Sequence, residues 1–130
     1  MRDALNKTGR PIFYSLCQWG EEHTAQWAPE VGNSWRTTGD INDSFESMAK
    51  NFFQTIPDQS VARPGGWNDP DMLEVGVKRL LVNGMSLHEE QTHFALWAVT
   101  KAPLIIGADL RSIHKDSLEI LKNEELIAVN

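Results

Sequence analysis

Asn33-Ser34-Trp35-Arg36-Thr37-Thr38-Gly39-Asp40-Ile41 is the stretch that decides the predicted fold. It is typical of a short strand that ends in an arginine and, four residues later, an aspartate. Apolar residues then recur at helical spacing from 43 to 56, which predicts an amphipathic helix. A strand, charged residues at its carboxyl end and a following helix form the repeating unit of parallel α/β folds. Asp40 is therefore either a catalytic group or a cap of the next helix, and position alone favours capping.

Three further strand–helix units surround this stretch, and the end of a helix at residues 1–10 precedes them. Strands alternating with helices predict a parallel sheet with crossover helices. Four units are too few for a closed eight-stranded barrel, which needs about 250 residues. An open sheet and half of a barrel remain, and the lack of a glycine-rich phosphate loop favours the half barrel. The predicted strands are 12–17, 66–73 and 102–109, and their helices are 24–31, 87–100 and one from about 116.

Composition excludes several classes of protein. The 130 residues are 41% hydrophobic and 23% charged, as in globular domains, and the formal charge of −6 argues against a nucleic-acid partner. No apolar run approaches the roughly 18 residues of a membrane span. The opening MRDALNKTGRP lacks the apolar core of a signal peptide, so we expect no export signal in this chain. Cys17 is the only cysteine, which is either inert packing or half of a pair whose partner lies elsewhere.

Polar residues recur at the carboxyl end of each predicted strand. Such ends share one rim of a parallel sheet, so these residues are expected to converge on one site. Carboxylates that accept hydrogen bonds from hydroxyls, beside an indole face, suit a sugar. Simpler interpretations are that the aspartates cap helices or form a type I turn at 69–71, and that Trp67 and Trp97 are core residues. The strand-end residues are Gln18, Trp19, Arg36, Asp40, Asp69, Asp71 and Asp109.

Two metal motifs and one nucleophile motif are excluded by spacing. His88 and His93 lie five residues apart, whereas a zinc-protease helix needs four. Residues 40–44 resemble the start of a calcium loop, but Phe45 stands where the turn requires glycine. No G-x-S-x-G elbow is present. We therefore expect neither a metal ion nor another cofactor.

Four motifs together resemble one family. In order and spacing they are similar to motifs of the α-galactosidases of glycoside hydrolase family 27, and most similar to those of plants or fungi. The motifs are PIFYSLCQWG (11–20), GNSWRTTGDI (32–41), PGGWNDPDML (64–73) and KAPLIIGADLR (101–111). The resemblance covers the whole chain. It implies an α/β fold, the (β/α)8 TIM barrel, of which residues 1–130 would supply strands five to eight with their helices. It also implies hydrolysis of terminal α-linked galactose with retention of configuration.

The resemblance assigns roles to individual residues. Asp40 matches the general acid/base, and Cys17 also matches one half of a disulfide. Many relatives have Glu where this chain has Gln18, in a loop that helps to separate galactose from N-acetylgalactosamine specificity. The residues expected to bind the sugar are Arg36, Asp71, Trp19, Gln18, Cys17 and Met72.

One catalytic group of the family is missing from the sequence. A retaining glycosidase needs a second carboxylate as nucleophile, which the family carries in a KYDNC-like motif at the end of strand four. No such motif occurs here. The chain is therefore expected to be the C-terminal half of a secreted enzyme that acts on terminal α-galactosides and needs its own N-terminal half. The alternative is a non-catalytic, galactose-binding pseudoenzyme fragment.

Overall fold

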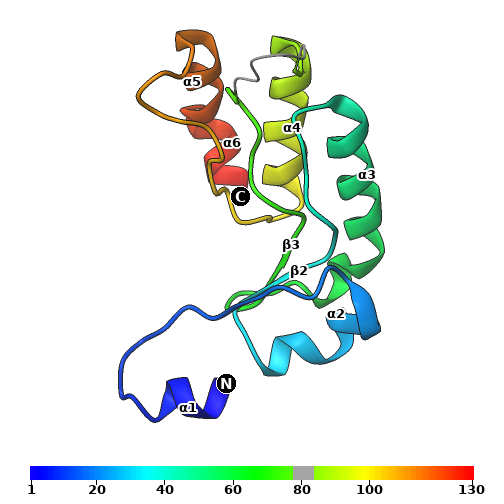
Figure 1. The fold of residues 1–130 in the computed structure, drawn as a ribbon, viewed down its shortest axis with the longest axis vertical. Coiled ribbons are helices and arrows are strands. Elements are labelled where there is room, and N and C mark those ends of the chain that lie inside the picture. The colour runs from blue at the N-terminus through cyan, green and yellow to red at the C-terminus, as the bar shows by residue number, and fades with distance from the viewer. Residues whose placement is uncertain (78–83) are drawn as a thin grey trace.

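A three-stranded parallel sheet lies at the centre of the chain (Figure 1). The structure is a computed structural model that describes residues 1–77 and 84–130. The strands are β1 (Ser15–Leu16), β2 (Ser34–Arg36) and β3 (Trp67–Asp69), and they pair in the order β1-β2-β3. Arg36 is aligned with Asp69 across the β2–β3 pair. The predicted parallel α/β arrangement is confirmed for these strands, while the sheet they form is small and open.

Helices follow the strands, and α4 stands between α3 and the α5–α6 pair (Figure 1). The helices are α1 (Arg2–Asn6), α2 (Thr24–Trp27), α3 (Phe45–Thr55), α4 (Leu87–Val99), α5 (Lys115–Leu121) and α6 (Glu124–Val129). Short 3-10 turns at Glu21–His23, Ala28–Glu30 and Ile56–Val61 flank α2 and extend α3. No helix within the described ranges combines the length and the apolarity that a membrane crossing requires.

Side-chain caps fix where the two long helices begin. Ser44 caps α3 by accepting a hydrogen bond from the Ser47 N–H, at 3.2 Å. Ser86 and Glu89 form a capping box at α4, in which the Ser86 N–H donates to Glu89 Oε2 at 2.7 Å. These bonds satisfy N–H groups that the helix itself leaves unpaired. Helix α4 begins at the predicted residue, Leu87, and α3 begins at Phe45, two residues after the predicted start.

The predicted strands are longer than those of the structure, and the one at 66–73 is only β3. The strand predicted at 12–17, buried on both faces, is only β1, and Ile12 and Phe13 beside it are exposed. The strand predicted at 102–109 is a single parallel bridge between Leu73 and Ile106. A strand forms only where a neighbouring strand pairs with it along its length. Near the start of this segment, Pro103 also lacks the N–H that such pairing would use. The last predicted helix is also two helices, because Asn123 caps α6 by accepting from the Leu126 N–H.

The hydrophobic core lies where α3, α4 and α5 meet. Trp97, predicted as a core residue, is fully buried there, whereas Trp67 is only half-buried. The residues of the core cluster are Met48, Leu73, Val75, Met85, Phe94, Trp97, Ala102, Ile120 and Leu121. Since Leu73 and Val75 belong to this cluster, residues 71–76 pack against α4.

Candidate functional site

Arg36, at the carboxyl end of β2, is the centre of the candidate site. Its Nη2 atom donates to Asp71 Oδ2 at 2.8 Å, to Asp40 Oδ1 at 3.2 Å and to the Thr38 carbonyl at 3.2 Å. The side chains of Arg36 and Asp71 are 13% and 8% exposed, whereas that of Asp40 is 72% exposed. The structure thus brings together three predicted site residues from two separate units, and only Asp40 faces solvent freely.

One buried donor of Arg36 is unpaired among the described residues. Its Nε atom is buried and makes no hydrogen bond to any residue in the described part of the chain. A buried N–H without an acceptor is costly, so a ligand hydroxyl or another protein group is expected to complete it. The Arg36 Nε therefore lacks an acceptor among the described residues.

Asp71 is the most constrained residue of the cluster. Its Oδ2 also accepts from the Ile41 N–H, and its Oδ1 accepts from the Met72 N–H, both at 2.8 Å. Its φ of 89° lies in a region that residues other than glycine rarely adopt. This value excludes the type I turn considered for residues 69–71, whose third residue has φ near −90°. Asp71 is a fixed acceptor rather than a mobile one.

Asp40 does not cap a helix. Helix α3 begins after Ser44, four residues further on, so the capping interpretation of Asp40 is wrong. The Asn51 side chain holds the backbone beside it by donating to the Gly39 carbonyl at 3.2 Å. Asp40 also lines a polar hollow with Ser47 and Lys50. An exposed carboxyl group on a held backbone can exchange a proton with a bound molecule.

Within the described part of the chain, the other two strand-end aspartates make no hydrogen bond to the Arg36 side chain: Asp69 lies beside the cluster, and Asp109 lies away from it. Asp69 is buried, and burial raises the pKa of its carboxyl group against the opposing effect of the hydrogen bond from the Asp71 N–H, at 2.9 Å. Asp109 is bound by Arg111 through two side-chain hydrogen bonds of 2.9 and 3.0 Å, which lower the pKa of Asp109. Its N–H partner, also on Arg111, closes a local turn well before α5, so Asp109 neither caps that helix nor joins Arg36.

The loop after β1 lies against the end of β2. The Gly20 N–H donates to the Arg36 carbonyl at 3.0 Å, and a Cβ at Gly20 would lie 2.4 Å from the Thr37 carbonyl oxygen. This close approach requires glycine and fixes Trp19 near the cluster, where the residue is 45% exposed. Cys17 and Gln18 share a hollow of their own with Trp19.

Cys17 and Met72 complete the set of predicted residues. The Cys17 thiol is free and exposed. Met72 follows Asp71 directly and is 41% exposed. No three His, Cys, Asp or Glu residues within 1–77 and 84–130 are grouped so that they could hold a metal ion.

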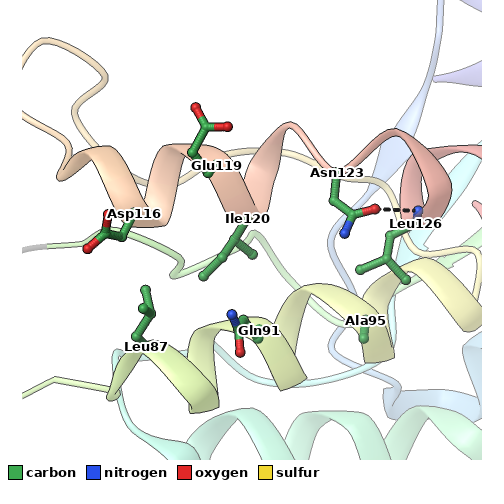
Figure 2. Close-up of a pocket in the computed structure, with 8 residues that line it drawn as sticks. All are labelled: Leu87, Gln91, Ala95, Asp116, Glu119, Ile120, Asn123 and Leu126. Carbon is green, nitrogen blue, oxygen red and sulfur yellow. Dashed lines mark hydrogen bonds between the residues drawn. The ribbon is translucent and has the colours of Figure 1, made fainter.

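A larger hollow lies elsewhere, between α4 and the α5–α6 pair. Figure 2 shows Leu87 and Ala95 of α4 across from Ile120 and Leu126, with Asp116 and Glu119 on the opposite helix. It contains no residue of the Arg36 cluster and is a gap between packed helices.

Sequence reasoning missed the residues that support Asp71 from behind. The Trp97 indole Nε1 donates to the Asp71 carbonyl at 2.7 Å, and His93 Nε2 accepts from the Glu74 N–H at 3.0 Å. Burial lowers the pKa of His93 to about 4, so His93 is neutral at pH 7. Trp97 was predicted as a core residue and His93 appeared only in the excluded zinc motif, and nothing in the sequence indicated hydrogen bonds from them to residues 71–76.

The whole chain is similar to known proteins of one family. The family model described as "Alpha galactosidase A" matches residues 1–130. Alpha-galactosidase 3 of Arabidopsis thaliana is 56% identical over the whole chain, which covers 29% of that relative. The structure of the Saccharomyces cerevisiae α-galactosidase with raffinose is 38% identical with a TM-score of 0.91, and alignment covers 99% of this chain and 32% of that one. For α-galactosidase I of Mortierella vinacea the values are 40%, 0.92, 99% and 36%. The chain spans about a third of these relatives.

Proposed function

The chain belongs to the alpha galactosidase A family, and from this premise we propose that it supplies the acid/base and galactose-binding half of a retaining α-galactosidase. The observation that carries the proposal is the Arg36 nitrogen that binds the fixed Asp71 and the exposed Asp40 together. The end of β2 thus combines a held carboxylate, Asp71, with an exposed one, Asp40, and Arg36 binds both. An enzyme that must bind a sugar and protonate its leaving group needs both kinds of carboxyl group.

In this proposal residues 1–130 are the C-terminal half of a (β/α)8 barrel, within a longer protein. The order β1-β2-β3 follows the sequence, and the bridge between Leu73 and Ile106 adds the next segment in the same parallel sense. Apolar residues lie exposed beside β1, at Ile12 and Phe13, and at the bridge, at Ile105 and Ile106. The remaining strands of the barrel would cover them, in keeping with the share of the relatives that the chain spans.

Asp40 is the proposed general acid/base. It would give its proton to the oxygen of the departing group and later take one from the attacking water. Retention needs a second carboxylate about 5–5.5 Å away as nucleophile. Asp71 is unsuited to that role because three hydrogen bonds occupy its two oxygens. The nucleophile would therefore come from the other half of the barrel.

Asp71 and Arg36 would instead bind the hydroxyl groups of the galactose. Asp71 Oδ1 accepts only one hydrogen bond from the described residues and would accept another from a hydroxyl group, while the Arg36 guanidinium would donate to the sugar. Trp19 would lie against the apolar C–H face of the ring, with Gln18 and Met72 beside it. No cofactor is required for this chemistry. The exposed Cys17 thiol would pair with a cysteine of the other half, which fits a secreted protein.

The test is Asp40→Asn in the full-length protein, assayed with two substrates. Raffinose has a sugar leaving group that needs protonation, and nitrophenyl α-galactoside has a good leaving group that needs little. We expect kcat/KM for raffinose to fall by about 10²–10⁴ and the value for the nitrophenyl substrate to fall far less. Asp109→Asn, at an exposed aspartate outside the cluster, is the matched control. Equal values for both variants and both substrates would refute Asp40 as the acid.

A second candidate function is galactose binding without catalysis. It is favoured by one observation: in the described residues, the Arg36 cluster contains no carboxylate other than Asp40 with a free face. Calorimetry of the full-length protein distinguishes the two functions. Binding of galactose without any turnover of nitrophenyl α-galactoside would select this second candidate.

A further inference from the structure

We infer that one face of α4 is a positioning device for Asp71: Glu90, His93 and Trp97, termed the α4 polar stripe, hold the backbone of residues 71–76 by side-chain hydrogen bonds. The effect on sugar binding rests on the proposed function, whereas the positioning itself does not. The stripe residues lie at i, i+3 and i+7, so they share one side of the helix. All three are buried.

The first two bonds lie closest to the site. Trp97 Nε1 donates to the Asp71 carbonyl at 2.7 Å, and the Glu74 N–H donates to His93 Nε2 at 3.0 Å. The two rings also touch edge to face, with centroids 4.1 Å apart. Each ring is thereby fixed by the other, and the distance between the two anchored backbone groups is set by the helix.

Glu90 anchors the far end of the segment. Its Oε1 accepts from the Gly76 N–H at 2.9 Å, and its Oε2 accepts from the Ser117 hydroxyl on α5 at 2.6 Å. Gly76 has φ of 77° and lies against Ile113, which leaves no space for a side chain. The stripe therefore connects α4 and α5 to a segment whose path is closely defined.

The segment needs such support because a sheet supplies little of it. Beyond β3, the only residue of 71–76 with a described strand-type pairing is Leu73, at the bridge to Ile106. Pro70, which directly precedes the segment, has no N–H to donate. Asp71 adopts an unfavourable φ of 89°, which persists only where surrounding contacts enforce it. The indole bond to its carbonyl is a contact of that kind.

Asp71 carries this support directly to the site. The carbonyl bound by Trp97 and the carboxylate bound by Arg36 belong to the same residue. The carboxylate also accepts from the N–H groups of Ile41 and Met72, so a shift of the Asp71 backbone would loosen all three bonds. Ion pairs of this geometry depend strongly on direction, and small displacements weaken them.

The experiment compares Trp97→Phe with Trp35→Phe. Trp35 is a stringent control because it is equally buried, precedes Arg36 and also donates one indole hydrogen bond, at 2.7 Å, but to the Asn68 side chain. Amide hydrogen exchange at Ile41 and Met72 reports the Asp71 carboxylate. Relative to global unfolding in each variant, Trp97→Phe should speed exchange there about tenfold, as loss of one buried hydrogen bond implies, and Trp35→Phe should leave it unchanged. Equal rates in both variants would overturn the inference.

A second pair guards against a variant that does not fold. His93→Leu removes the acceptor of the Glu74 N–H, while His93→Gln retains one. We expect faster exchange at Met72 in the leucine variant and near-normal exchange in the glutamine variant. Identical exchange in the two would count against positioning by the stripe.

Kinetics of the full-length protein form the last measurement. Trp97→Phe should raise KM for nitrophenyl α-galactoside about tenfold with kcat nearly unchanged, since Asp71 is proposed to bind hydroxyl groups in ground state and transition state alike. An unchanged KM in an active protein would overturn the link to sugar binding. If the wild-type full-length protein showed no galactosidase activity, the proposed function would be refuted. The exchange rates would still test whether the α4 polar stripe positions Asp71.

Discussion

If the pH is lowered from 7.5 to 5, His93 should destabilise the fold. The imidazole is completely buried, and its Nε2 accepts a hydrogen bond that a protonated ring cannot accept. Burial lowers the pKa of His93 from an ordinary 6.5 to about 4. At a pH between these two pKa values, His93 is protonated in the unfolded chain and neutral in the folded chain.

The sign and size of the effect follow from linkage. Because the folded pKa is lowered, the stability is fully present above pH 6.5 and is lost progressively as the pH falls toward 4. Between pH 7.5 and pH 5 the loss from this group alone is about 2 kcal/mol, and its limit at lower pH is about 3 kcal/mol.

Urea denaturation at the two pH values measures this loss. Carboxyl groups also titrate in part of this range, so His93→Gln is the reference: it keeps an acceptor for the Glu74 N–H and carries no titrating proton. The difference in unfolding free energy between pH 7.5 and pH 5 should be about 2 kcal/mol smaller in the variant. The same difference in both proteins would refute the assignment to His93.

Other substitutions test the remaining features. Arg36→Gln leaves the buried Asp71 without its cation and should cost about 2 kcal/mol in urea denaturation, together with loss of galactose binding by calorimetry. Gly76→Ala forces a Cβ to within 2.6 Å of the Ile113 side chain at a φ of 77°, and thermal melting should show a loss of about 1–3 kcal/mol; a neutral result would contradict the close packing. Ser86→Ala removes the capping box and should lower stability by about 1 kcal/mol, a loss that Ser86→Asp should largely restore. The 130-residue chain alone should not hydrolyse nitrophenyl α-galactoside, and robust turnover would refute the missing nucleophile.

Local chemistry made parts of the fold predictable. The capping box of Ser86 and Glu89 depends on residues three apart, so the start of α4 follows from the sequence. The segment 102–109 has the composition of a strand, yet it pairs at one point only, because pairing depends on which chain lies beside it. Composition reports the preference of a segment, and neighbours decide the outcome.

The site was predictable to a similar extent. Because parallel strands bring their carboxyl ends together, the meeting of Arg36, Asp40 and Asp71 was predictable, whereas Asp109, predicted at the same rim, binds Arg111 instead. Strand-end position alone did not separate Asp69 from Asp71, although both are buried and only Asp71 binds the Arg36 side chain. That difference arises from the positive φ of Asp71, which depends on contacts with α4 that lie far away in sequence.

The sheet order β1-β2-β3 bears on how the chain acquires its structure during synthesis. Each strand pairs with the one made immediately before it, so the sheet can grow in the direction of translation, with one helix closing each step. Domains fold from the N-terminal side as the chain emerges. The Asp71 segment can settle only after α4 has left the ribosome, since Trp97 follows Asp71 by 26 positions. The Arg36 cluster is therefore expected to be among the last parts of this region to become ordered on a nascent chain.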